Sequence, residues 1–351
     1  MSSGQITIEG RVVSLGQPCY LIAELSANHN HDLDRALQLI DTAAASGADA
    51  IKIQTYTADT LTIDSDQPWF RIGAGTLWEG RTLHDLYGEA FTPWEWTEAL
   101  IERAQKHGLA LFSTPFDVTA VEFLEQFDPP AYKIASFELV DLDLIRVVAA
   151  TGRPIIMSTG MASLTEIDDA VAAARSAGAD ELLLLRCNSA YPASPGEMDL
   201  NTIPHMRATW GVPVGLSDHT LNVAAAVTAV ALGGCAIEKH FTDSREVPGP
   251  DSAFSLEPHE FRTMVDVVRD AERALGNVRY GPTPSEEASL AFRRSLFVVE
   301  DVLAGEGFTT TNVRCIRPGH GLPPKNLAVV LGRTAATDIA RGTPLSWGLL
   351  S

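Results

Sequence analysis

The sequence lacks long apolar runs and any excess of basic residues, two features that large classes of protein require. Its 351 residues contain no uninterrupted apolar run of about 18, the length that a membrane-spanning helix needs. Lys and Arg number 26 against 45 Asp and Glu, a formal net charge of -19. A general nucleic-acid-binding protein needs a basic surface instead. We therefore expect neither a membrane protein nor a nucleic-acid-binding protein.

Cysteine is also scarce, and the spacing of the cysteines indicates the redox compartment of the protein. The four cysteines are Cys19, Cys187, Cys235 and Cys315, and no two of them form a C-x-x-C pair. Wide spacing in mostly apolar surroundings favours reduced, buried thiols over disulfide bridges. The first residues also lack the basic start, apolar stretch and small-residue cleavage site of a secretion signal. These features predict a cytoplasmic protein.

The sequence does contain a regular alternation of short, β-branched apolar runs with longer amphipathic stretches. This alternation is typical of βα units and a parallel sheet. No G-x-G-x-x-G follows the first run, which argues against a dinucleotide-binding fold. Eight runs favour a closed (β/α)8 barrel, the TIM barrel. The expected strands are residues 20–24, 50–54, 109–113, 131–134, 155–158, 181–186, 214–217 and 236–238.

A polar stretch with two Gly and two Pro, residues 276–287, is the best candidate for a domain boundary. We expect a barrel domain with an N-terminal hairpin over residues 1–280, a linker over 281–290 and a small β-rich module over 291–351. From residue 291 onward the chain has seven Lys and Arg against four Asp and Glu, whereas the rest is strongly acidic. Such a module concentrates positive potential locally.

Polar residues gather where the expected strands end, which is where TIM barrels build their active sites. Alternate residues of a strand share a face, so Lys52 and Gln54 point the same way, as do Glu238 and His240, whereas Lys239 points opposite. Buried charges are costly unless they are paired or bind a ligand. The other polar residues at these positions include Glu24, Thr114, Lys133, Ser136, Ser158, Ser189, Ser217, Asp218 and His219.

Two histidines at the ends of neighbouring expected strands suggest a metal site. His219 and His240 are placed to bind one divalent ion, with water or a substrate oxygen completing the coordination. A single histidine is more often structural, but the nearby carboxylates Glu24, Asp218 and Glu238 favour the metal.

Two lysines, Lys52 and Lys133, end strands that are otherwise apolar. One interpretation is a pair of salt-bridged residues that stabilise the barrel rim. The other is a pair of cations that neutralises the phosphate and carboxylate of an anionic substrate, and we favour it. Nearby hydroxyls would complete such an anion site without adding charge; they belong to Thr114, Ser136, Ser158 and Ser189.

Many separate motifs, spread over nearly the whole chain, resemble the sialic acid synthase family. Those of the barrel are Ile22-Ala23-Glu24, Asn28-His29-Asn30, Gly47-Ala48-Asp49-Ala50-Ile51-Lys52, Ser113-Thr114-Pro115-Phe116, Ala131-Tyr132-Lys133-Ile134, Gly215-Leu216-Ser217-Asp218-His219 and Ile237-Glu238-Lys239-His240-Phe241. The segment from Arg317 to Lys325 resembles the family's C-terminal antifreeze-like (SAF) module. Within the family, the chain is most similar to the pseudaminic subgroup in Leu25-Ser26-Ala27-Asn28 and in residues 54–60, 92–96 and 251–256.

This resemblance implies an enzyme that condenses phosphoenolpyruvate with an acetamido hexose and cleaves the C–O bond of phosphoenolpyruvate. For the pseudaminic subgroup the hexose is 2,4-diacetamido-2,4,6-trideoxy-altrose, and the products are pseudaminate and phosphate. The resemblance further implies manganese (Mn²⁺), with Mg²⁺ or Co²⁺ as alternatives, on His219 and His240, where it activates the open-chain aldehyde. A domain-swapped homodimer is also implied, with Arg317 of one chain reaching the N-acetyl group of the sugar in the other.

The resemblance assigns the remaining site residues as well. Glu238 would lie beside phosphoenolpyruvate, and Glu24, Gln54, Tyr191 and Asp251 near the sugar. The residues implied to hold phosphoenolpyruvate are Lys52, Lys133, Thr114, Ser136, Ser158 and Ser189, and the substrate site also includes Phe116 and Ser217.

Three departures from the family pattern leave the sugar open. His31 stands where Gly is expected, Asn188-Ser189-Ala190 replaces Thr-Ser-Thr, and residues 246–250 are less typical of the pseudaminic subgroup. Legionaminate or N-acetylneuraminate synthesis by the same chemistry is therefore an alternative. Two others are of different classes: a Schiff-base aldolase that uses Lys52 or Lys133, and a barrel that binds sugars without catalysis.

Overall fold

A computed structural model describes residues 4–351 of the chain. The chain divides after Gly276, and Asn277–Ser351 forms a second compact unit. Residues 281–290, expected as a linker, include most of a 3-10 helix, Pro284–Phe292, in which no residue is buried. No helix among residues 4–351 is long and apolar enough to cross a membrane.

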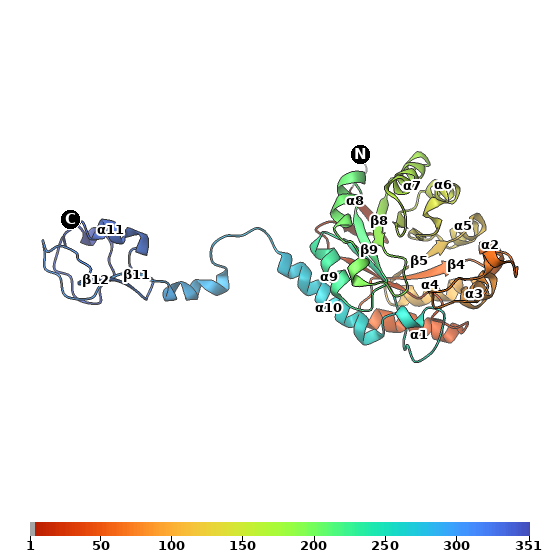
Figure 1. Cartoon of the computed structure of the whole chain (residues 1–351), viewed down its shortest axis with the longest axis horizontal. Helices are drawn as coiled ribbons and strands as arrows, with labels where there is room; N and C mark the ends of the chain where they lie inside the picture. The colour runs from red at the N-terminus through yellow and green to blue at the C-terminus, as the bar shows by residue number, and fades with distance from the viewer. Residues whose placement is uncertain (1–3) are drawn as a thin grey trace. The chain divides into compact units, whose positions relative to one another are not determined.

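Eight parallel strands close into a barrel in chain order, with the last strand pairing with both the one before it and the first (Figure 1). Each expected run forms a strand, with ends that differ by at most a few residues, so the predicted (β/α)8 fold is confirmed. The strands are β3 (Tyr20–Glu24), β4 (Ala50–Thr55), β5 (Ala110–Pro115), β6 (Tyr132–Ile134), β7 (Ile155–Ser158), β8 (Leu182–Cys187), β9 (Val214–Asp218) and β10 (Ala236–His240).

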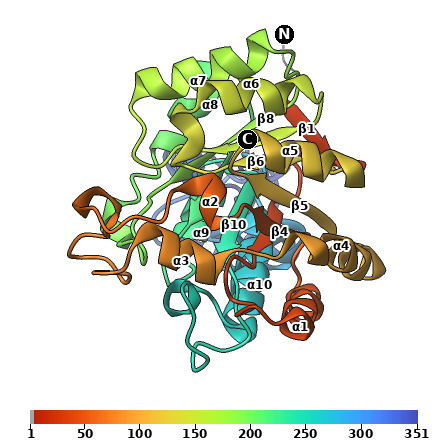
Figure 2. The ribbon, with the colours of Figure 1, turned by 90° about the vertical axis from the view of Figure 1, so that its right-hand side faces the viewer.

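Helices connect these strands and surround the barrel (Figure 2). Their starts follow from local sequence: Asp32 accepts a hydrogen bond from the backbone of Arg35 at one start, and Ser163 and Glu166 form a capping box at another. The helices of this unit are α1 (Leu33–Ala45), α2 (Ala58–Leu61), α3 (Leu83–Ala90), α4 (Thr97–Lys106), α5 (Val118–Leu124), α6 (Leu142–Ala150), α7 (Leu164–Ser176), α8 (Thr202–Trp210), α9 (Ala224–Ala231) and α10 (Pro258–Leu275).

The floor of the barrel is a closed apolar cluster. An N-terminal hairpin of β1 (Gln5–Ile8) and β2 (Arg11–Ser14) packs its buried Ile6, Ile8 and Val13 against the first inward residues of the strands. Gly215 belongs to this close packing, because a Cβ there would lie 2.4 Å from the carbonyl oxygen of Ala236. The strand residues of the cluster include Tyr20, Ile22, Ala50, Ala110, Phe112, Ile156, Leu183, Leu185 and Ala236.

Further along most strands the inward residues become polar, while outward positions pack against the helices. Lys239, between Glu238 and His240, points out of the barrel, and its Nζ lies 2.7 Å from Asp218 Oδ2 with both side chains fully buried. The expectation that Asp218 belongs to the carboxylates near the metal is therefore wrong. Asp218 directly follows the inward Ser217. Because successive side chains of a strand point to opposite faces, the side chain of Asp218 points away from the barrel interior.

The second unit has its own small core. Its antiparallel pair is β11 (Ser295–Val298) and β12 (Val313–Ile316), and its helix is α11 (Leu327–Val330). The buried residues of that core are Leu296, Val298, Val302, Phe308, Val313, Leu322, Val330, Ala335, Ile339 and Leu345.

The buried pair outside the barrel gives a stability prediction. Lys239→Met leaves the Asp218 carboxylate buried without its cation, and we expect a loss of about 3–5 kcal/mol in unfolding free energy, measured by urea denaturation. Arg262→Met breaks an exposed pair with Asp266 on α10 and serves as the control. That variant is expected to lose less than about 1 kcal/mol. Equal losses in the two variants would contradict this account of the buried pair.

Candidate active site

Four buried charged residues meet at the carboxyl ends of the strands. Lys52 forms ion pairs with Glu24 and with Glu238, whose Oε1 lies 3.4 Å from Lys52 Nζ. Lys133 Nζ lies 3.3 Å from the same Oε1. Strand register places Glu24 beside Lys52 on one side and beside His240 on the other. None of the four side chains is appreciably exposed, so their charges act on one another with little screening.

Burial and pairing set the pKa of each group. Burial alone would lower the pKa of Lys52, but Glu238 and Glu24 outweigh it and raise that pKa, so Lys52 stays cationic. Burial lowers the pKa of Lys133 despite Glu238. The pKa of Glu24 is raised by burial, against the effect of Lys52. For Glu238, burial is outweighed by Lys133 and Lys52, which lower its pKa and keep it anionic.

Two predicted hydroxyls, those of Thr114 and Ser217, contact the paired charges. Thr114 Oγ1 accepts a hydrogen bond from Lys52 Nζ at 3.3 Å, and Ser217 Oγ donates to Glu238 Oε1 at 3.4 Å. Ser158 Oγ is buried and has no protein partner. A buried hydroxyl without a partner is unfavourable unless a ligand or water pairs with it.

Two further hydroxyls converge over a glycine that the sequence reasoning missed. Gly160 follows β7, and its N–H donates to Ser136 Oγ at 3.0 Å. A Cβ at Gly160 would lie 2.2 Å from Ser189 Oγ and 2.7 Å from Ser136 Oγ. The absence of a side chain at Gly160 therefore lets both hydroxyls converge at this point, and convergent hydroxyl donors suit an anion. The position of Gly160 directly after Ser158 and Thr159, at a strand end, was the available signal.

The two histidines lie together as predicted, with ring centroids 5.3 Å apart. His219 Nδ1 is 2.7 Å from the carbonyl oxygen of Asn188, which can only accept, so this nitrogen carries a proton and the neutral ring has its lone pair on Nε2. His240 Nδ1 is buried without a partner. Over residues 4–351, no group of three or more His, Cys, Asp or Glu is arranged around one point to hold a metal. These imidazoles fit a divalent ion whose remaining ligands are water or substrate oxygens.

Two of the predicted sugar contacts, Gln54 and Asp251, are joined to this cluster by hydrogen bonds to Glu24 and Ser26. Gln54 Nε2 donates to Glu24 Oε1 at 3.3 Å, and Asp251 accepts hydrogen bonds from Ser26 Oγ and from the backbone of Ala27. Ser26 was not among the predicted site residues. It follows β3 by two residues and lies in the motif Leu25-Ser26-Ala27-Asn28, and these were the signals for it.

Aromatic rings line the same mouth of the barrel. The Tyr191 ring is 4.4 Å from that of His219 and 5.0 Å from that of Phe254, which also lies 4.8 Å from the His240 ring. Phe254 comes from the loop after β10 and was missed, because nothing in its spacing distinguishes it from a core residue. Phe116, a predicted substrate contact, directly follows β5 and packs on Tyr56 with ring centroids 5.0 Å apart.

One predicted residue belongs to the second unit, and one residue near the lysine pair was not predicted. Arg317 belongs to the second unit, directly after β12, with an exposed side chain, and its role in a partner chain stays a prediction. Glu138, missed by the sequence reasoning, follows β6 and has a buried Oε2 without a partner. Burial raises its pKa to about 7, against the effect of Lys133. Glu138 is therefore a third carboxyl near the lysine pair, and it titrates near neutral pH.

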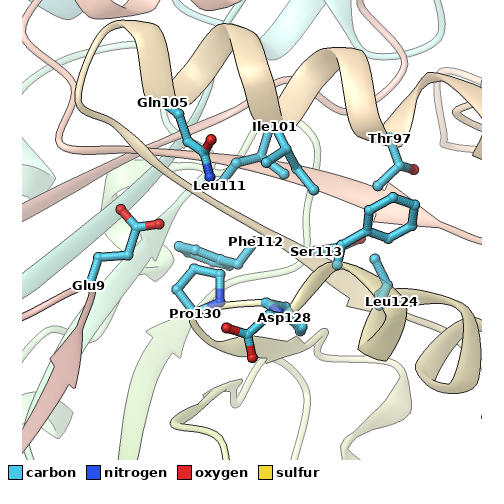
Figure 3. Close-up of a pocket in the computed structure, with 12 residues that line it drawn as sticks. Glu9, Thr97, Ile101, Gln105, Leu111, Phe112, Ser113, Leu124, Asp128 and Pro130 are labelled. Carbon is cyan, nitrogen blue, oxygen red and sulfur yellow. The ribbon is translucent and has the colours of Figure 1, made fainter.

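A separate pocket lies between α4, β5 and the hairpin turn (Figure 3). Its polar lining includes Glu9, Gln105 and Asp128, and it has no basic side chain. None of the predicted site residues lines it. Because two carboxylates without a cation repel anions, this pocket does not suit a phosphorylated substrate.

Comparison with known proteins fits the geometry at the strand ends. Residues 39–280 match the NeuB family, and residues 293–351 match the SAF domain. The chain belongs to the NeuB family. A pseudaminic acid synthase of Campylobacter jejuni subsp. jejuni serotype O:2 is 44% identical over 329 residues, 94% of this chain and 96% of that protein. A pseudaminic acid synthase of Helicobacter pylori is 42% identical over 332 residues, 94% and 97% of the two chains.

Among solved structures, the chain is similar to the N-acetylneuraminic acid (sialic acid) synthetase from Leptospira borgpetersenii serovar Hardjo-bovis in complex with citrate. The TM-score is 0.73 at 31% identity, covering 82% of this chain and 95% of that one. The predicted resemblance to the sialic acid synthases, with a C-terminal SAF domain, is confirmed. This NeuB-family chain is an enzyme, and its relatives carry the name of synthases.

The carboxyl of Glu138 makes the stability of this enzyme depend on pH. Because its pKa is about 7 in the folded chain against 4.5 ordinarily, the folded state binds more protons between these values and loses stability as pH rises through them. Glu138→Gln removes that ionisation. We expect the variant to gain up to about 3 kcal/mol over the parent at pH 8 and almost nothing at pH 4.5, measured by thermal unfolding across pH.

The matched control is Glu122→Gln on α5, an exposed carboxyl with no buried partner to lose. Its stability difference from the parent should be small and flat across the same pH range. A flat difference for Glu138→Gln as well would show that this carboxyl does not titrate between pH 4.5 and 8.

Proposed function

We propose that the protein is a pseudaminic acid synthase, which condenses phosphoenolpyruvate with 2,4-diacetamido-2,4,6-trideoxy-altrose to give pseudaminate and phosphate. The observation that carries the proposal is the pairing of two buried lysines with convergent hydroxyls beside a two-imidazole site. The choice of sugar is supported by the names of the Campylobacter and Helicobacter relatives, each more than 40% identical along almost its full length.

Phosphoenolpyruvate would bind at the lysine pair. Lys52 and Lys133 neutralise its carboxylate and phosphate, and Ser136 and Ser189 donate hydrogen bonds in the space that Gly160 leaves open. The remaining hydroxyls of the predicted anion site, those of Thr114 and Ser158, lie at the ends of neighbouring strands and add donors without adding charge.

His219 and His240 would hold the divalent metal, which we propose is Mn²⁺, with Mg²⁺ or Co²⁺ as alternatives. When bound, such an ion polarises a carbonyl oxygen and stabilises the negative charge that develops on it. His219 presents Nε2 for this purpose, because its Nδ1–H is held by the carbonyl oxygen of Asn188.

The two carboxylates at the centre suit different tasks. Glu238 stays anionic and would stabilise the cationic character that appears at C2 when C3 of phosphoenolpyruvate attacks the sugar aldehyde. Glu24, whose pKa burial raises, suits the transfer of a proton from the water that adds at C2. Loss of phosphate from the resulting tetrahedral centre breaks the C–O bond.

A homodimer and a cytoplasmic location complete the proposal. Four apolar side chains after the neighbouring strands β6 and β7 are more than half exposed, those of Phe137, Val140, Met161 and Leu164. Exposed apolar groups near the mouth of a site favour a covering partner, and the proposed partner is the basic C-terminal module of a second copy with its Arg317.

The cytoplasmic location is supported by four free cysteines.

The proposal is tested by phosphate release with phosphoenolpyruvate and a panel of acetamido sugars. We expect fast turnover of the diacetamido altrose, slow turnover of N-acetylmannosamine and loss of activity in chelator. Label in the bridging oxygen of phosphoenolpyruvate should leave with phosphate. Preference for N-acetylmannosamine, or for the legionaminate precursor, would overturn the choice of sugar.

A trapping experiment distinguishes our proposal from the aldolase alternative. The lowered pKa of Lys133 favours that alternative, because an amine nucleophile must be uncharged. Borohydride trapping of substrate on a lysine, with full activity in chelator, would support that alternative and contradict ours.

Gly160 gives a sharper test of the anion site. In Gly160→Ala the added methyl must displace the hydroxyls of Ser136 and Ser189. We expect the KM for phosphoenolpyruvate to rise about tenfold or more, with the KM for the sugar nearly unchanged. Gly88→Ala in α3, where a Cβ would meet nothing within 4 Å, is the control and should change neither constant. An unchanged KM for phosphoenolpyruvate in Gly160→Ala would remove these hydroxyls from the anion site.

A further inference from the structure

Ser26, just after β3, has a backbone conformation that its side chain makes unfavourable. Its φ is 45°, in the left-handed region that glycine enters at least cost, yet the residue is a buried serine. Strained, non-glycine residues of this kind persist where the surrounding structure fixes them, and they gather at functional sites. The hydroxyl of Ser26 therefore needs a reason for its presence.

Four hydrogen bonds, two of the hydroxyl and two of the adjacent backbone, account for its presence. The N–H of Ser26 donates to Glu24 Oε1 at 2.9 Å, and its Oγ donates to Asp251 Oδ2. The same Oγ accepts a hydrogen bond from Gln54 Nε2 at 3.0 Å, while the next N–H, of Ala27, also donates to Asp251 Oδ2 at 3.4 Å. One hydroxyl thus connects the end of β3, the end of β4 and the loop that follows β10.

These bonds fix the orientation of the Gln54 amide. Its Nε2 faces two protein acceptors, Glu24 Oε1 at 3.3 Å and Ser26 Oγ at 3.0 Å. A carboxylate can only accept, so the amide cannot turn its oxygen toward Glu24. Gln54 Oε1 is then the group that remains for a ligand. Asp251 likewise presents a carboxylate, which also only accepts.

We propose that Ser26 is a positioning residue that determines sugar specificity by holding Gln54 and Asp251 as a pair of hydrogen-bond acceptors. Such a pair recognises donors on the sugar, namely the N–H of an acetamido group and a neighbouring hydroxyl. This inference rests on the proposed function, because it takes Gln54 and Asp251 as sugar contacts. Ser26 itself acts through these two residues and not on the reacting atoms.

Replacement by glycine separates the hydroxyl from the backbone strain. Ser26→Gly removes the hydroxyl and also relieves the left-handed φ, so the variant should unfold at the same temperature as the parent or higher. We expect its kcat/KM for the diacetamido sugar to fall about tenfold or more, because Asp251 loses a donor and Gln54 loses an acceptor. The KM for phosphoenolpyruvate should stay within about twofold, since the lysine pair makes no hydrogen bond to Ser26.

Two variants control this experiment. Ser26→Ala removes the hydroxyl but keeps the strain, so it should reproduce the loss in sugar kcat/KM even if the glycine variant folds poorly. Glu9→Gly relieves a similar φ of 46° in the turn of the N-terminal hairpin, away from the strand ends. That variant should gain stability without changing either KM.

Specificity is measured as the ratio of kcat/KM for the diacetamido sugar to that for N-acetylmannosamine. We expect this ratio to shrink in both Ser26 variants. An unchanged ratio, or an equal rise in the KM for phosphoenolpyruvate and for the sugar, would overturn the role of Ser26. If the parent enzyme fails to turn over the diacetamido sugar at all, the proposed function fails instead, so the two failures are distinguishable.

Discussion

The ion pairs among Glu24, Lys52, Glu238 and Lys133 are the constraint on which the rest of the barrel depends. Four charges buried from water at the strand ends stabilise one another only if their separations stay short, so the strands that carry them must be held rigidly. The apolar floor supplies that rigidity, because the hairpin and the first inward residues of most strands fill the lower barrel. The charged layer is thereby confined to the mouth, where a substrate can reach it.

The alternation of inward and outward side chains along the strands explains why so much of this site could be predicted from the sequence. Once a strand is recognised, the alternation fixes which residues face inward, so Lys52 with Gln54, and Glu238 with His240, follow directly. The same rule separates Lys239 from its neighbours, and the ion pair of Lys239 outside the barrel confirms that separation. It also applies to Asp218, and the error there came from counting a residue as nearby because it is adjacent in sequence to Ser217 and His219.

The residues that were missed lie where no periodic rule applies. Ser26 sits in a left-handed conformation, Gly160 matters for the space it leaves, and Glu138 follows a strand of only three residues. Their contacts depend on how separate loops meet in space, which local sequence does not specify. Of the three, Ser26 alone lies in a motif that resembles the family, Leu25-Ser26-Ala27-Asn28, and that motif does not show what its hydroxyl contacts.

This difference between strands and loops bears on how one chemistry serves several sugars. The groups assigned to phosphoenolpyruvate stand mostly at strand ends, whereas those assigned to the sugar depend on the loop after β3 and the loop after β10. Asn28 joins these two loops through hydrogen bonds to the carbonyl of Phe241 and the hydroxyl of Ser255. Because Ser26 connects the joined loops to Gln54 and not to either lysine, their sequence can change while the lysine pair stays in place. Sugar specificity can therefore vary within the family without rebuilding the site of the common substrate.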